Sequence, residues 1–183
     1  MMKRSALLLC LLAVACGEQS RMPAPSSDTA ATTAEGDSAG SAGCEQFTRE
    51  GLKLAARTRS ALESEAGRPL NITARVEQNR HMPAMADSIF QYEYDGLTVR
   101  LRRAGPGGEL FEQVIVTDRK WLNFPYFRPG VSAEKVIQVM GEPQGRVDNQ
   151  LIYRCGDSEA EEPVVFEISE GAVQRIVFNY YVD

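Results

Sequence analysis

The sequence predicts an α+β fold of two tandem units, each a short helical segment followed by a three- to four-stranded antiparallel meander sheet. One observation is a repeated helix stop: Gly67-Arg-Pro69 and Gly141-Glu-Pro143 each end an amphipathic run, and 74 residues separate the two glycines. Glycine takes the left-handed conformation that closes a helix, and proline prevents its continuation. The second observation is that strand-like runs follow each stop. Together they predict a duplicated α/β unit.

Residues 1–15 are expected to be a signal peptide. Two basic residues lie within the first four, and the apolar run 5–15 follows; it is shorter than the ~20 residues that span a bilayer. The run ends in small residues before Cys16 and resembles a bacterial lipobox, although Ala13 stands where a larger aliphatic residue is usual. We expect Cys16 to carry a lipid anchor with palmitate-type chains. The alternative is ordinary signal-peptide cleavage at the A-x-A site formed by Ala13 and Ala15. That cleavage gives a secreted soluble protein with a spare thiol.

The remaining cysteines fit an exported protein. Of the four in the sequence, Cys10 would leave with the signal peptide and Cys16 would carry the lipid. Cys44 and Cys155 remain, and two thiols left in an exported protein most simply form a disulfide.

Residues 16–43 are expected to be a flexible, lipid-anchored linker. Small residues and proline dominate them, and such a composition cannot bury enough apolar area to offset its backbone entropy. The folded part is therefore expected to begin near Cys44. Its two units are predicted at 44–120 and 121–183.

In the first unit, Thr58 is expected to cap the helix that Gly67 ends, with Leu62 at a buried position. Phe47 and Leu54 suggest an additional upstream helix that runs into it. The expected strands are 89–94, 97–103 and 111–117, with a turn at Asp95-Gly96 and a further strand that could form at 72–77. Arg100 and Arg102 alternate with apolar residues, so they are expected on the outer face of a strand.

In the second unit, Ser132 is expected to cap the helix that Gly141 ends, with Val136 and Met140 at helical spacing. The expected strands are 151–155, 164–168 and 173–181, with a turn at Glu170-Gly171. Only a short link is expected between Pro143 and the first of these strands.

The second unit resembles a known family. Residues 129–143, Ile152-Tyr153, 165–168 and 171–173 are similar to the BamE and SmpA/OmlA pattern of a capped helix ending in Gly-x-Pro, a Tyr-bearing strand and a Phe strand. A tandem of two such units resembles the β-lactamase-inhibitor-protein fold. The resemblance implies a fold more than an activity. The bridges of those inhibitors lie within units, whereas a bridge between Cys44 and Cys155 would join the two.

Composition and motifs favour a protein that is not an enzyme. The sequence has 20 Lys plus Arg against 25 Asp plus Glu, a net charge of −5, and the basic residues are scattered, so a nucleic-acid partner is not expected. Nucleophile-elbow, phosphate-loop, metalloprotease and zinc-ligand spacings do not occur. No catalytic residue and no cofactor are therefore expected.

The single histidine offers one alternative. His81 lies close to Met82 and Met85, and imidazole with thioether ligands suits Cu(I). A periplasmic Cu(I)-binding protein is thus an alternative to a loop in which these side chains only pack.

We expect the chain to bind a protein partner in the cell envelope while a lipid anchors it to the bacterial outer membrane, facing the periplasm or the cell surface. The partner could be an enzyme that the domain blocks, as an inhibitor or immunity protein does. The alternative is a structural accessory of an outer-membrane assembly complex. Trp121, Phe124, Tyr126 and Phe127 are candidate contacts because aromatic residues dominate interface energetics; the other interpretation is that they pack as core where the units join.

Overall fold

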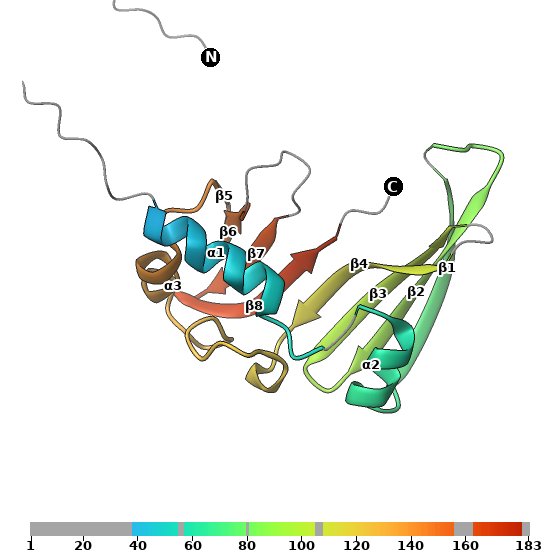
Figure 1. Cartoon of the computed structure of the whole chain (residues 1–183), viewed down its shortest axis with the longest axis horizontal. Helices are drawn as coiled ribbons and strands as arrows, with labels where there is room; N and C mark the ends of the chain where they lie inside the picture. The colour runs from blue at the N-terminus through green and yellow to red at the C-terminus, as the bar shows by residue number, and fades with distance from the viewer. Residues whose placement is uncertain (1–37, 55–56, 80, 105–107, 156–162, 181–183) are drawn as a thin grey trace, which may run out of the picture. The chain divides into compact units, whose positions relative to one another are not determined.

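The computed structural model describes residues 38–54, 57–79, 81–104, 108–155 and 163–180 (Figure 1). The helices are α1 (Ser38–Glu50), α2 (Arg59–Ala66), the 3₁₀ helix η1 (Arg119–Trp121) and α3 (Ala133–Met140). The strands are β1 (Asn71–Gln78), β2 (Ala86–Tyr94), β3 (Leu97–Ala104), β4 (Glu109–Val116), β5 (Gly145–Val147), β6 (Gln150–Tyr153), β7 (Val164–Ser169) and β8 (Ala172–Asn179). The expected signal peptide, Cys16 and most of the expected linker lie outside the described residues.

The eight strands form a single antiparallel sheet in the order β1-β2-β3-β4-β8-β7-β6-β5. Within each run of four, consecutive strands are neighbours, as a meander requires. The two runs meet where β4 pairs with β8, from Gln113 opposite Asn179 to Val116 opposite Ile176. The α+β class and the antiparallel strands that the sequence predicts are confirmed.

Two helices begin and end as the sequence predicts. The Thr58 hydroxyl accepts a hydrogen bond from the N–H of Ala61, and the Ser132 hydroxyl accepts one from the N–H of Lys135, so each cap satisfies an amide that the helix leaves unpaired. Gly67 and Gly141 follow α2 and α3 with φ of 73° and 81°, in the left-handed region that glycine adopts without strain.

The prediction that the upstream helix runs into the Thr58 helix is wrong. α1 ends at Glu50, and Leu52 then forms an isolated antiparallel bridge with Leu122. Gly51 permits this turn, because a Cβ at that position would lie 2.3 Å from the carbonyl oxygen of Phe47. α1 begins at Ser38, so its first turn lies in the segment that the sequence analysis assigned to the linker.

Two further features differ from the sequence-based expectation. The short strand β5 forms where only a link was expected after Pro143, because it pairs with β6. The turn at Gly96 joins β2 to β3, whereas the turn at Gly171 joins β7 to β8. The two turns therefore occupy different positions within their runs of four strands.

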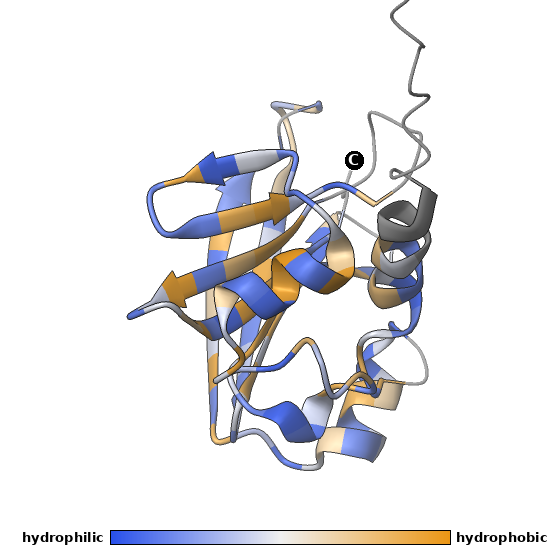
Figure 2. Cartoon of the chain, turned by 90° about the vertical axis from the view of Figure 1, so that its left-hand side faces the viewer, coloured by the Kyte–Doolittle hydropathy of each residue, from blue (hydrophilic) through white to orange (hydrophobic). Residues whose placement is uncertain are grey.

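One face of the sheet carries the hydrophobic core. A row of buried residues crosses six neighbouring strands on this face: Tyr92, Val99, Val114, Phe178, Val164 and Tyr153. Phe47 of α1 packs on the same side of the sheet as this row, because its ring centroid lies 5.4 Å from that of Phe178. Figure 2 shows the resulting alternation of hydrophobic and hydrophilic residues along the strands. We call this side the helix face.

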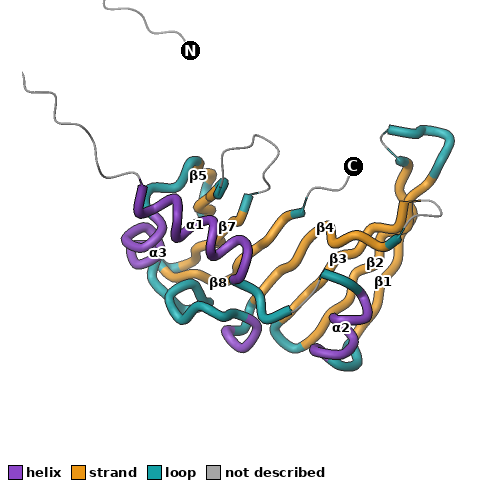
Figure 3. The backbone as a smooth tube through the Cα atoms, viewed as in Figure 1, coloured by secondary structure: helices purple, strands orange, loops and turns teal. Residues whose placement is uncertain are grey.

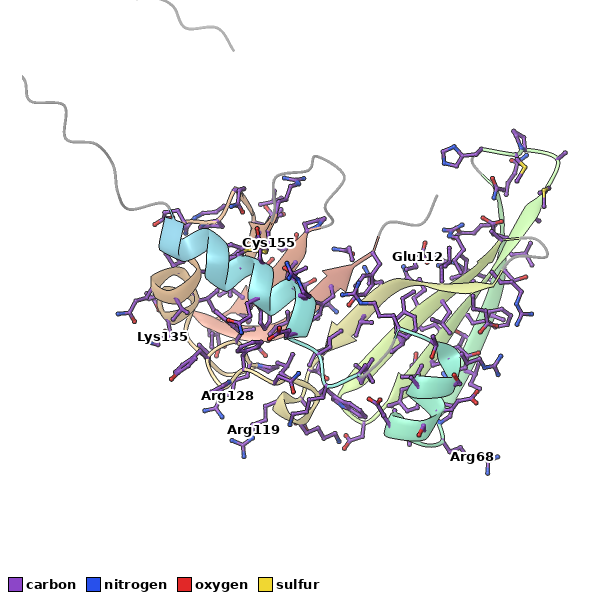
Figure 4. The ribbon with its side chains drawn as sticks, in the orientation of Figure 1. Arg68, Glu112, Arg119, Arg128, Lys135 and Cys155 are labelled. Carbon is purple, nitrogen blue, oxygen red and sulfur yellow. A yellow bond between two sulfur atoms is a disulfide. The ribbon has the colours of Figure 1, made fainter. Side chains whose placement is uncertain are left out.

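The predicted disulfide is confirmed. Cys44 of α1 is bonded to Cys155, which follows β6, with their Cα atoms 5.0 Å apart. Both residues are buried in the core, and Figure 4 shows Cys155 beside α1. The bridge spans 111 residues of sequence.

Candidate functional site

The other side of the sheet, which we call the open face, carries mostly polar side chains. One row crosses all eight strands: Asn71, Glu93, Thr98, Ile115, Val177, Val165, Ile152 and Gly145. A second row lies beside it: Thr73, Gln91, Arg100, Gln113 and Asn179. Residues opposite each other in neighbouring strands share a face, so the register places amides, charges and branched aliphatic side chains on one continuous surface.

Arg102 is the centre of a charged network on this face. Its guanidinium donates hydrogen bonds to Glu112 Oε1 at 2.6 Å, to Asp87 Oδ2 at 3.0 Å and to Glu77 Oε2 at 3.2 Å. These carboxylates come from three different strands. The Arg102 side chain is 13% exposed and that of Asp87 is 3% exposed, so solvent screens this ion pair less than an ordinary surface pair.

Two more arginines balance the network. Arg75 Nη2 lies 2.6 Å from Glu77 Oε1, and Arg100 Nε lies 3.9 Å from Glu112 Oε2. With Arg102 and Asp87, this makes three arginines and three carboxylates, so the formal charges cancel. These ion pairs link side chains of β1, β2, β3 and β4.

Asn79 connects the network to the loop between β1 and β2. Its side-chain amide donates to both carboxylate oxygens of Asp87, at 3.0 and 3.2 Å. The hydrogen bond from Asn79 lowers the pKa of Asp87, and the ion pair with Arg102 lowers it further, against the desolvation that raises it. Asp87 is therefore held in its charged form.

Two hollows of about 250 Å³ each lie on the open face. The first is lined by residues of β1 to β3: Thr73, Ala74, Arg75, Ile89, Gln91 and Arg100. The second is lined by residues of β4, β8, β7 and β6: Gln113, Ile115, Gln150, Val165, Glu167, Arg175, Val177 and Asn179. Each combines hydrogen-bonding groups with apolar side chains, which is the composition of a recognition surface.

Internal contacts orient the polar groups of the second hollow. Gln113 Nε2 donates to Asn179 Oδ1 at 2.9 Å, and Arg175 Nε donates to Glu167 Oε2 at 2.5 Å. The Arg175 side chain remains 48% exposed. These groups can therefore still bond to a protein that covers the sheet, while their rotamers are already restricted.

The four aromatic residues for which the sequence left two interpretations, contact surface or core, do not form one exposed surface. Phe127 is buried, and its ring centroid lies 4.5 Å from that of Phe47. Phe124 packs at 6.0 Å from the same ring, and Trp121 donates its indole N–H to the carbonyl oxygen of Asp95 at 2.9 Å. Tyr126 is 55% exposed. The stretch closes the core over Phe47 and presents only Tyr126 as a large exposed aromatic side chain.

The candidate copper ligands lie in the loop between β1 and β2, which projects from the ends of these strands (Figure 3). Asn79 Oδ1 accepts hydrogen bonds from the N–H groups of His81 and Met82, at 2.9 and 2.8 Å. Met82 is 52% exposed and Met85 is half-buried. Among the described residues, no cluster of three or more His, Cys, Asp or Glu side chains could hold a metal ion.

Arg100 and Arg102 were expected on the outer face of a strand, but the alternation that places them there does not predict the network around Arg102. Asp87, Glu77, Glu112 and Asn79 are scattered along the sequence, and only the strand register brings them together. Alternation along β1 and β2 would have placed Glu77 and Asp87 on the polar side without revealing their partners.

Comparisons of the chain with protein-family models, with curated proteins and with solved structures gave no match. None of the helices in the described part of the chain is long and apolar enough to cross a membrane.

Proposed function

We propose that the chain is a bacterial envelope lipoprotein, anchored through Cys16, whose domain binds an envelope enzyme and blocks it. The open face of the sheet is the proposed binding surface. The observation that carries this proposal is the combination of two polar-and-aliphatic hollows with side chains that the protein already holds in place.

Preorganised side chains favour binding because immobilising a long side chain at an interface costs about 0.5–1.5 kcal/mol. In the free domain, carboxylate partners already hold the side chains of Arg102 and Arg175, the latter in a half-exposed pair. A specific interface needs about 800 Å² on each partner, and an eight-stranded sheet offers a surface of that order. Ile115, Val165 and Val177 supply a central apolar strip, and polar residues surround it.

We further infer that the sheet consists of two tandem units of the kind found in the β-lactamase-inhibitor-protein fold. The strand order supports this inference, since each run of four strands begins at an edge of the sheet, with β1 or β5, and ends at the central β4–β8 pair. α2 precedes the first run and α3 the second, with the same pattern of hydroxyl cap and left-handed glycine. The disulfide joins the two runs rather than lying within one, so the fold resemblance does not carry over the target of those inhibitors.

The proposal is tested by site-specific photo-crosslinking of the full-length protein in its native host. A photoreactive amino acid is placed at Gln91 in the first hollow or at Gln150 in the second. The matched control sites are Lys135 of α3 and Ser64 of α2, which are exposed; Figure 4 shows Lys135 pointing away from the sheet. We expect a crosslinked partner from Gln91 and Gln150, in the membrane fraction, and none from the control sites.

The Cys16→Ser variant tests the anchor in the same experiment. Each buried methylene of a lipid chain contributes about 0.8 kcal/mol to membrane binding, so loss of two or three chains should release the protein from the membrane fraction. Membrane retention of the variant after normal cleavage would refute lipidation. Crosslinks from Lys135 and Ser64 but not from Gln91 and Gln150 would refute the open face as the binding surface.

The crosslinked partner also decides the mode of action. If it is an enzyme, adding the domain should reduce its activity in proportion to complex formed. If it is instead a component of an outer-membrane assembly complex, the structural-accessory alternative replaces inhibition. A Cu(I) role would require metal uptake that depends on His81, Met82 and Met85.

A further inference from the structure

β1 forms one edge of the sheet and leaves its outer side without a partner strand in the described part of the chain. The strand is eight residues long, and seven of its residues are exposed. The opposite edge strand, β5, has only three residues. Natural sheets protect their edges with short strands, charged side chains, proline or bulges, and β5 is protected by its length. β1 has no proline or lysine, and its two charged residues, Arg75 and Glu77, pair with each other on the open face.

The hydrogen-bonding groups on the free side of β1 belong to its even-numbered residues. The N–H of Asn79 donates to the carbonyl oxygen of Met85 at 3.0 Å, which marks a hydrogen-bonded pair between the strands. Such pairs recur every second residue of an antiparallel ladder. Odd-numbered residues of β1 therefore bond to β2, and the backbone groups of Ile72, Ala74 and Val76 point outward.

The same three residues carry the exposed apolar side chains of the edge. Ile72 lies opposite Tyr92, a buried residue of the helix face, so Ile72, Ala74 and Val76 all lie on that face. Ile72 is 52% exposed and Val76 is 72% exposed. Outward backbone groups and uncovered apolar side chains on the same residues are what a further antiparallel strand would satisfy.

From this edge we infer that two copies of the chain dimerise by pairing β1 with β1, antiparallel and centred on Ala74. In this register Ala74 of one copy lies opposite Ala74 of the other, and Ile72 lies opposite Val76 of the second copy. About six backbone hydrogen bonds would form, and the apolar residues of the two copies would meet on the helix face. On the open face Asn71 lies opposite Glu77 and Thr73 opposite Arg75, so no like charges are directly opposed.

Other registers are poorer. If one strand slips by one residue, an even-numbered residue with free backbone groups lies opposite an odd-numbered residue whose groups already bond to β2. The helix face of one copy then adjoins the open face of the other. Centring the pair on Arg75 sets two guanidinium groups directly opposite each other, which is destabilising. Centring it on Val76 sets Arg75 opposite Glu77 but leaves Ile72 beyond the end of the partner strand. Among these registers, only the one centred on Ala74 matches both faces, opposes no like charges and pairs both Ile72 and Val76 within β1.

Single-cysteine variants of the full-length protein test the pairing and its register. Ala74→Cys places two thiols opposite each other at an inter-strand distance that a disulfide can span. Ile72→Cys and Val76→Cys are the matched controls, because each thiol would lie opposite a different residue of the second copy. On non-reducing gels we expect a covalent dimer from Ala74→Cys in high yield, and little from the two controls.

A charge on the edge tests the association without a new disulfide. Ala74→Lys should convert the dimer to monomer in sedimentation experiments over a concentration series. Val147→Lys, at an exposed position of the other edge strand, should leave the dimer intact, and both variants should keep the thermal stability of the wild-type monomer.

A wild-type protein that is monomeric at every concentration would overturn the proposal. So would a dimer that survives Ala74→Lys, or one in which Val76→Cys crosslinks better than Ala74→Cys. These tests measure self-association of the chain and not binding of the envelope partner, so their failure would leave the proposed function standing.

Discussion

Among the charged residues described on the open face, Arg102 pairs with the most carboxylates. It pairs with Asp87, Glu77 and Glu112 at once, and its side chain is 13% exposed. Removing one member of a buried charge group leaves the others without compensation, which is more costly than losing an exposed pair. The network is thus a structural element as well as part of the proposed surface.

Arg102→Met should lower the free energy of unfolding by about 2–4 kcal/mol, less than for a fully buried pair because water reaches part of the network. Arg103→Met is the matched control. Arg103 is the next residue, 45% exposed, and pairs with Glu109; its loss should cost no more than about 1 kcal/mol. Equal effects of the two variants in urea titrations would contradict the importance of the network.

Asp87 should make the free energy of unfolding depend on pH in the acid range. Its pKa is lowered in the folded protein, by the hydrogen bond from Asn79 first and by Arg102 next, whereas an unfolded chain has an ordinary Asp pKa near ~3.9. The unfolded state therefore binds more protons in acid. The stabilisation from Asp87 is present above about pH 4 and is lost as pH falls through the folded-state pKa.

Asp87→Asn should remove this part of the acid dependence, so its unfolding free energy should fall less steeply than that of the wild type below about pH 4. Asn79→Ala removes the largest cause of the shift and should move the acid transition to higher pH. Urea unfolding at a series of pH values provides the measurement. Parallel curves for wild type and Asp87→Asn would show that Asp87 contributes nothing.

At the scale of elements, the hydroxyl caps fix where α2 and α3 begin. Ser132→Ala should lower the free energy of unfolding by about 1 kcal/mol, because the N–H of Lys135 loses its side-chain acceptor. Ser64→Ala, at an exposed position inside α2, is the control. It should be neutral or slightly stabilising because alanine has the higher helix propensity. A Ser132→Ala protein as stable as the Ser64→Ala protein in thermal unfolding would contradict the cap.

Elements that depend on local chemistry could be predicted from the sequence. The hydroxyl caps, the glycine stops and the two hairpin turns are determined by a few adjacent residues. The separation of α1 from α2 could not be predicted, because it depends on the bridge between Leu52 and Leu122. β5 was missed for the same reason: three residues without strong alternation become a strand only beside β6. The charged network likewise requires the register of four strands.

For the whole molecule, the disulfide is the covalent link between the first and last runs of strands. In the chain-entropy description, closing a 111-residue loop restricts the unfolded state by an equivalent of about 4–5 kcal/mol. Reduction should therefore lower the melting temperature by more than about 10 °C. The double variant Cys44→Ala with Cys155→Ala should reproduce this loss without reductant. Unchanged melting under reduction, with both thiols shown to be free, would contradict a stabilising role.

The proposed function requires that the open face of the sheet meets the partner. A charge-swapped pair tests this most directly. Glu167→Arg with Arg175→Glu keeps an ion pair on the open face but exchanges the positions of its positive and negative charges. Arg59→Glu with Glu63→Arg does the same for a pair on α2, and both proteins should remain folded.

The measurement is the yield of the partner crosslink from a photoreactive residue at Gln150 in each background. We predict that the swap at Glu167 and Arg175 abolishes the crosslink, because charges that matched the partner now oppose it, while the swap on α2 leaves the yield unchanged. A crosslink that persists through the first swap and disappears with the second would contradict the open face as the binding surface.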